Sequence, residues 1–232
     1  MTQYTRLLRE IYWFIIILLL KFYARLTSNV VRNVRGLKIY IPYGVFSPVR
    51  TFSTELILDF LQEYLSETQG KHIKFCDMGT GTGIIAILAA KRGCTVVASD
   101  ISKKAIRAAK VNAFLNDVEI DLRLGDLFSC YGRNEKFDII VFNPPYFPIK
   151  AKSEFSATYA AGEQYEVIVR FLKEAKYHLA ENGFLLMTLT SLIDEDLILN
   201  IAGKLCYKVE RIREIKGMPK EVISLYKLSL RS

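Results

Sequence analysis

The stretch Phe137–Tyr146 reads FDIIVFNPPY and joins a mostly apolar run to an Asn-Pro-Pro-Tyr motif. The run from 137 to 142 predicts a buried strand that ends directly at the motif. The two prolines fix φ and keep the residue before each of them out of the helical region, so the loop should be stiff. Such a strand places the motif at the carboxyl edge of a sheet, where open α/β proteins bind their ligands. The candidate catalytic residues are Asn143, Pro144, Pro145 and Tyr146.

The motif offers hydrogen-bond acceptors and a flat ring within one short loop. The side-chain amide of Asn143 and the carbonyl of Pro144 can converge on one small amino group, and Tyr146 adds a face on which a planar group can stack. The competing interpretation is an ordinary proline turn after a strand. A second loop of a ligand-binding type, upstream in the chain, favours the functional interpretation.

That second loop follows a predicted strand at 73–77 and leads directly into a predicted helix at 83–92. Its glycines allow the backbone to approach a ligand closely and to turn sharply into the helix. A glycine-rich turn alone is a weak signal, because dinucleotide-binding proteins use a related one. The loop residues expected at a cofactor are Asp77, Gly79, Thr80, Gly81, Thr82 and Gly83.

Three acids mark the ends of three successive predicted strands. Asp77 can accept from a cationic amino group, Asp100 from two ribose hydroxyls, and Asp126 from an adenine amino group. This set suits an amino acid joined to a nucleoside, as in S-adenosylmethionine, and suits a pyrophosphate poorly. Helix capping at each strand end is the alternative. We also expect Ile101, Leu127 and Asn143 at the same cofactor.

The rest of the chain predicts an α/β fold with a seven-stranded, mostly parallel sheet. Strands that alternate with long helical segments indicate crossover connections, whereas the last two strands are joined too tightly for one and should form an antiparallel hairpin with a turn at 217–219. Ser53 or Thr54 should cap the first helix of this domain. The strands are expected at 73–77, 95–99, 118–124, 137–142, 183–190, 206–215 and 221–230, and the helices at 55–66, 83–92, 103–114, 166–180 and 193–205.

Residues 1–50 form a predicted basic extension ahead of the domain at 51–232. They hold eight basic side chains and one acid, a net charge of +7, whereas the whole chain has +8. A helix is predicted at 3–27 and two short strands at 29–41. The ten uninterrupted apolar residues at 11–20 are too few to span a bilayer. The helix should therefore be covered by the domain itself, by a partner, or by a membrane surface to which it attaches peripherally.

Cysteine usage predicts a reducing compartment. The four cysteines lie far apart and form no Cys-x-x-Cys pair, and the two histidines show no ligand spacing. We therefore expect no metal site, reduced thiols and a cytoplasmic protein.

Taken together, these motifs resemble the class I S-adenosylmethionine-dependent methyltransferases, which have a Rossmann-like fold. The closest resemblance is to the HemK-like glutamine N5-methyltransferases, in their archaeal and eukaryotic branch. It covers roughly residues 36–230 and is carried by the segments at 36–61, 77–83, 143–146 and 161–172, the last of which reads AGEQYEVIVRFL. The resemblance implies methylation of the GGQ glutamine of a class 1 release factor, with S-adenosylmethionine as cofactor.

The resemblance also implies partners. Members of this branch often work with a small zinc-binding activator subunit that covers an apolar sheet edge, and our hypothesis is that the helix at 3–27 replaces it. RNA methylation at adenine N6 or guanine N2 is the main alternative, with RNA or ribosome binding through the basic N-terminus. A cofactor-binding scaffold without catalysis is a third interpretation.

Overall fold

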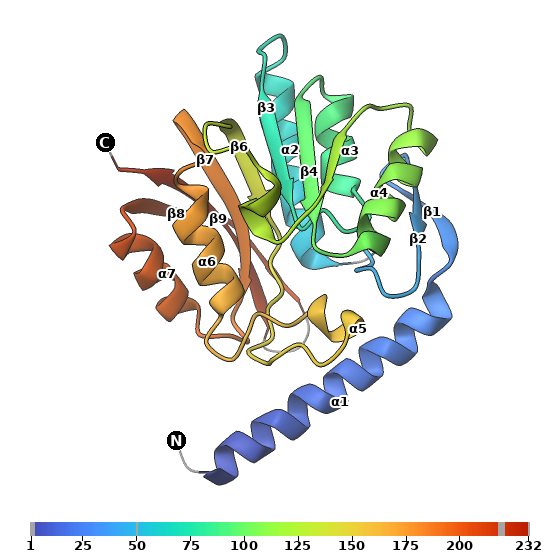
Figure 1. Cartoon of the computed structure of the whole chain (residues 1–232), viewed down its shortest axis with the longest axis vertical. Helices are drawn as coiled ribbons and strands as arrows, with labels where there is room; N and C mark the ends of the chain where they lie inside the picture. The colour runs from blue at the N-terminus through green and yellow to red at the C-terminus, as the bar shows by residue number, and fades with distance from the viewer. Residues whose placement is uncertain (1–2, 50, 218–220, 232) are drawn as a thin grey trace.

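One seven-stranded sheet organises the chain (Figure 1). The computed structural model describes residues 3–49, 51–217 and 221–231. The strand order is β5-β4-β3-β6-β7-β9-β8, in which β9 runs antiparallel to both β7 and β8 while the other neighbours are parallel. The predicted fold class is confirmed. The strands are β3 (Lys74–Met78), β4 (Thr95–Asp100), β5 (Asp121–Leu124), β6 (Phe137–Phe142), β7 (Leu179–Thr190), β8 (Tyr207–Lys216) and β9 (Val222–Leu230).

The helices alternate with the strands as the sequence predicts, with differences at their ends. Helix α6 ends at Ala175, earlier than expected, because Leu179 already pairs with Phe137 and opens strand β7. The predicted turn at 217–219 falls partly outside the described residues. The helices are α2 (Phe52–Glu67), α3 (Ile84–Lys91), α4 (Lys103–Leu115), α5 (Glu154–Ala157), α6 (Glu166–Ala175) and α7 (Glu195–Lys204), with a 3₁₀ turn η1 (Leu127–Cys130).

The predicted cap of α2 is wrong. The helix begins at Phe52, and its N-cap Thr51 makes no side-chain capping bond. Ser53 and Thr54 are instead buried in the first turn. The tertiary structure overrides the capping preference here, because the hydroxyl of Ser53 instead accepts a hydrogen bond from the side chain of Asn143, in the loop that follows β6.

Side chains of alternate strand residues pack into two hydrophobic cores, one on each face of the sheet. Cys76 and Ile140 join α6 and α7 in one apolar cluster, whereas their neighbours Phe75 and Ile139 join α2 and α3 in the other. This is the two-residue period of a β-strand buried on both faces. Because helices cover both faces of the sheet, a ligand can reach it only through the loops at the carboxyl ends of the parallel strands.

A hairpin of β1 (Val30–Val34) and β2 (Leu37–Ile41) packs against α4. The buried Asn112 side chain receives the Tyr40 N–H and donates to the carbonyls of Tyr40 and Thr82. Asn116 makes the corresponding pair of bonds with the backbone of Lys38. Two asparagines one helical turn apart thus join the hairpin, the helix and the glycine-rich loop.

Helix α1 (Gln3–Thr27) runs across the end of the molecule, away from the edge strands β5 and β8 (Figure 1). The arrangement does not support our hypothesis that this helix covers a sheet edge in place of an activator subunit. Within the residues whose side chains are described, none of the helices combines the length and apolarity needed to cross a lipid bilayer.

Candidate active site

The glycine-rich loop is held in place by the carboxylate of Asp77. Its Oδ2 accepts the Thr80 hydroxyl at 2.6 Å and the Ala86 N–H at 3.2 Å, so it joins the loop to the first turn of α3. Asp77 is 1% exposed, and burial raises its pKa to about 7. A buried carboxyl whose ionisation is opposed by its surroundings gains most from a nearby cation.

The loop is also joined to strand β4 and to helix α4. Gly81 donates its N–H to Asp100 at 3.0 Å, and Thr80 donates its N–H to the carbonyl of Ser99 at 2.9 Å. Gly83, with φ of +83°, lies so close to α4 that a Cβ would stand 3.0 Å from that of Ala109. Only glycine allows this approach at this backbone conformation, which is why the turn into α3 requires it.

The three acids lie at one edge of the sheet, as predicted, because their strands β3, β4 and β5 are parallel neighbours. Asp100 accepts two backbone N–H groups, and burial raises its pKa. Asp126 is about half exposed and pairs with Arg170 of α6 at 2.9 Å. Ile101 is exposed, whereas Leu127 is buried. Their roles at a cofactor stay predictions.

Asn143 lies among three hydroxyl groups from three different elements. Its Oδ1 accepts the Tyr146 hydroxyl at 2.8 Å and the Thr188 hydroxyl at 2.7 Å. Its Nδ2 donates to Ser53 Oγ at 3.2 Å. The carboxamide is thus oriented by α2, by β7 and by its own loop, and both of its ends are engaged.

Two of these partners, Ser53 and Thr188, are absent from the sequence-based site. Thr188 is fully buried near the carboxyl end of β7, and the register places it beside the end of β6, since Phe142 pairs with Met187. The sequence signal for Thr188 is a threonine inside the otherwise apolar strand segment FLLMTLT, which indicates a buried hydroxyl that needs a hydrogen-bond partner. The sequence predicts Ser53 only as a helix cap, because sequence alone does not show which strand the helix packs against.

The ring of Tyr146 is half-buried and packs against the apolar cluster beside α6. Its hydroxyl contacts the Thr188 hydroxyl at 2.6 Å, and burial raises its pKa. Pro144 is buried and Pro145 half-buried. Tyr146 therefore has a positioning contact that the sequence did not predict, while its stacking on a substrate stays a prediction.

Known proteins resemble this chain in sequence along most of its length. A family model described as the methyltransferase small domain matches residues 36–216. A protein of Methanocaldococcus jannaschii, provisionally named a protein N5-glutamine methyltransferase, is 32% identical over 190 residues, which is 79% of this chain and 91% of that protein. A release factor glutamine methyltransferase of Flavobacterium psychrophilum is 38% identical over 121 residues, covering 51% of this chain but only 42% of that relative.

Two solved structures show the same fold. The E. cuniculi Mtq2–Trm112 complex, described as responsible for methylation of the eRF1 termination factor, has a TM-score of 0.61 and 23% identity over 81% of this chain and 99% of that one. The T. thermophilus 16S rRNA N2 G1207 methyltransferase, in complex with AdoMet and guanosine, has a TM-score of 0.60 and 18% identity, and the match covers 87% of this chain and 50% of that one. Because the family model matches residues 36–216 of 232 and the Methanocaldococcus relative is matched along nearly its whole length, the chain belongs to the methyltransferase small domain family and is a methyltransferase with the class I fold.

Proposed function

We propose that this enzyme uses S-adenosylmethionine to methylate the side-chain amide nitrogen of a protein glutamine, namely the GGQ glutamine of a class 1 release factor. The observation that carries the proposal is the Asn143 carboxamide, oriented by three hydroxyls directly after a strand of the sheet. The glutamine methyltransferase names of the relatives support the choice of an amide substrate.

The residues at the glycine-rich loop fit the cofactor. Asp77 is a buried carboxyl with a raised pKa, so the cationic amino group of an amino acid would offset the cost of its ionisation. Asp100, at the end of the neighbouring strand β4, would accept the ribose hydroxyls, and Asp126, after the next strand β5, would accept the adenine amino group. S-Adenosylmethionine supplies a methyl group bound to a positively charged sulfur.

The chemistry of this chain is the orientation of the nucleophile. Asn143 Oδ1 and the Pro144 carbonyl accept the two hydrogens of the substrate amide, which turns the nitrogen lone pair toward the methyl group. The rate then depends on placement and on electrostatics rather than on a strong base. The amide proton leaves after transfer, when the nitrogen has become acidic.

The hydroxyl contacts around Asn143 leave room for this substrate hydrogen bond. Tyr146, Thr188 and Asn143 Oδ1 form a triangle with sides of 2.6, 2.7 and 2.8 Å, yet the two hydroxyls carry only two hydrogens. When Tyr146 donates to Thr188 and Thr188 donates to Asn143, one lone pair of Oδ1 is available to the substrate. This change needs rotation of hydroxyl hydrogens only.

The experiment is methyl transfer from radiolabelled S-adenosylmethionine. The enzyme is incubated with a matched release factor and, separately, with total RNA, each with and without a small zinc-binding activator subunit. We expect label in the factor that is lost when its GGQ glutamine is changed to alanine and when the enzyme carries Asn143→Ala. Label in RNA alone would replace the glutamine by a nucleobase as substrate.

A further inference from the structure

The outer face of α1 is an exposed apolar stripe that nothing in the described structure covers. Successive helix residues are about 100° apart, so the residues of this stripe project to one side along nearly the whole described length of the helix. Each is exposed by 47–70%. We call this set the outer stripe: Ile11, Ile15, Leu18, Leu19, Phe22 and Leu26.

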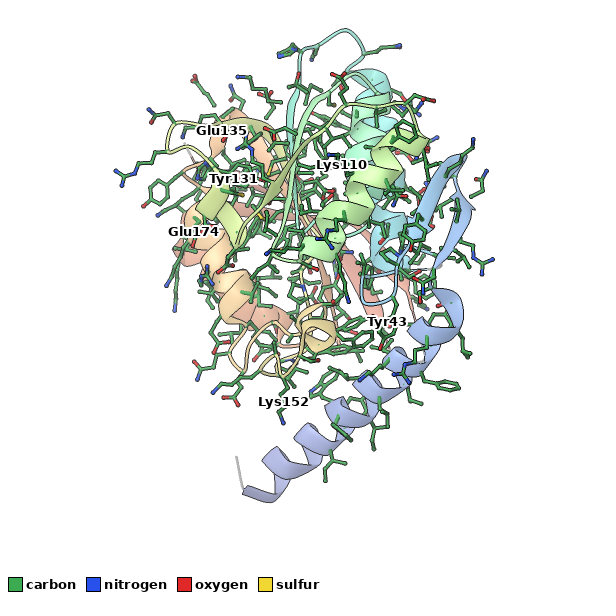
Figure 2. The ribbon with its side chains drawn as sticks, turned by 45° about the vertical axis from the view of Figure 1, so that its right-hand side comes forward. Tyr43, Lys110, Tyr131, Glu135, Lys152 and Glu174 are labelled. Atoms are coloured by element: carbon green, nitrogen blue, oxygen red, sulfur yellow. The ribbon has the colours of Figure 1, made fainter. Side chains whose placement is uncertain are left out.

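The opposite face of α1 is the one that contacts the body. Trp13 is 5% exposed and stacks on Phe147, with ring centroids 4.4 Å apart. Near the C-terminal end of the helix, Arg25 lies at the border between the two faces, 6.0 Å from the ring of Tyr43, which Figure 2 shows between the helix and the body. The more covered residues follow one helical stripe: Trp13, Ile16, Ile17, Leu20, Ala24 and Thr27. Burial against the protein therefore uses one side of the helix and leaves the outer stripe in solvent.

Charge decides which occupant the outer stripe suits. The helix carries Arg6, Arg9, Lys21 and Arg25 against the single acid Glu10, a net charge of +3. A second copy of the chain, packed stripe to stripe, would bring two such helices together and oppose like charges. The anionic headgroups of a lipid bilayer would attract the same cations, and the apolar side chains of the outer stripe would be buried among the acyl chains beneath them.

The shape of this face suits a flat layer. Lys21 and Arg25 follow one edge of the outer stripe, whereas Tyr12 and Tyr23 follow the other, and rings with a polar tip favour the interface between lipid and water. In both views the rest of the protein lies on one side of the helix only (Figures 1 and 2). Figure 2 shows the exposed Lys152 on the part of the protein that faces the helix. Nothing in the described structure obstructs the approach of a plane to the outer stripe.

We propose that α1 is an interfacial anchor that binds the enzyme to the surface of an anionic lipid bilayer through the outer stripe and its flanking cations. The helix lies in the plane of the surface and does not cross it. Because Trp13 stacks on the residue that follows the Asn-Pro-Pro-Tyr motif, the anchor holds the candidate active site close to the lipid. This inference does not depend on which substrate the enzyme methylates.

The test is co-sedimentation of the full-length protein with vesicles of phosphatidylcholine alone and of an equal mixture with phosphatidylglycerol. We expect binding to the mixed vesicles. The double variant Leu18→Asp/Phe22→Asp should lower the partition coefficient by at least about a hundredfold, since two apolar insertions become two anions. Lys21→Gln/Arg25→Gln should lower it by about thirtyfold on mixed vesicles and hardly change it on neutral ones.

The matched control is Phe114→Asp, which introduces the same charge at another exposed aromatic, on α4. It should leave vesicle binding unchanged. Wild-type protein that stays in the supernatant of the mixed vesicles would overturn the proposal. If sedimentation equilibrium showed a dimer that Leu18→Asp/Phe22→Asp converts to a monomer, the stripe would belong to a second copy instead. Methyl transfer measured on the same samples reports separately on the proposed function.

Discussion

Replacing Thr188 by valine tests whether the hydroxyls around Asn143 orient its carboxamide for catalysis. The change keeps the branched shape and removes one hydroxyl at a fully buried position. It deletes the 2.7 Å bond to Asn143 Oδ1 and the 2.6 Å contact with the Tyr146 hydroxyl. The two hydroxyl hydrogens make two hydrogen bonds among these three side chains, and one remains in the variant when Tyr146 donates to Asn143. The net loss of one bond predicts a decrease of about 1 kcal/mol in the free energy of unfolding.

The effect on catalysis should be separate from the effect on stability. In the arrangement that leaves a lone pair for the substrate, Thr188 is the hydroxyl that donates to Asn143 Oδ1. Without it the carboxamide is held less rigidly, and we expect kcat to fall by about 10–100-fold, or ~1.4–2.8 kcal/mol in the barrier. The affinity for S-adenosylmethionine, measured by calorimetry, should hardly change. Thr188→Ser should restore kcat, since it returns the hydroxyl.

The control is Thr190→Val, the same substitution two residues along β7, where the hydroxyl bonds Glu221 instead of the site. Steady-state methyl transfer is measured at a temperature at which all variants are folded. A kcat for Thr188→Val within about twofold of wild type would refute the orienting role, as would an equal loss in Thr190→Val.

Three further predictions concern the architecture of the site. Burial raises the pKa of Asp77 to about 7, whereas an aspartate in the unfolded chain titrates near 4. Between these two pH values the folded enzyme keeps a proton that the unfolded chain loses. The free energy of unfolding should therefore fall by up to about 4 kcal/mol between about pH 4 and 7 and then level off. Urea unfolding across pH should show this slope, and an unchanged slope in Asp77→Asn would contradict the assignment. Gly83→Ala should lower the free energy of unfolding, measured by thermal unfolding, by about 2–4 kcal/mol, because left-handed backbone strain adds to the clash with Ala109. Gly93→Ala has a similar φ of +86° but open space around it, so it should cost only the strain, about 1 kcal/mol. Equal losses in the two variants would contradict the packing argument. Asn112→Ala should cost about 3–5 kcal/mol in chemical denaturation, since it leaves backbone groups of β2 and of the glycine-rich loop without partners; a loss below about 1 kcal/mol would show that water replaces the side chain.

The features that depend on short stretches of sequence were predictable. The apolar run at 137–142, the two prolines after it and the glycines at 79–83 define strand, loop and turn through local backbone preferences. Because parallel strands present their carboxyl ends at one edge, the positions of Asp77, Asp100 and Asp126 along the chain also placed them in one row.

Contacts between distant segments required the tertiary structure. Ser53 and Thr188 lie 90 and 45 residues from Asn143 and reach it only because α2 packs on the sheet and β7 pairs with β6. The insertion of β9 between β7 and β8 likewise depends on pairing and not on local preference. For α1, the sequence determined an apolar helix with flanking cations, whereas its packing through Trp13 decided which face stays exposed. Local preference acts within a few residues, but the choice of partners depends on burying whole faces at once, which only the assembled core does.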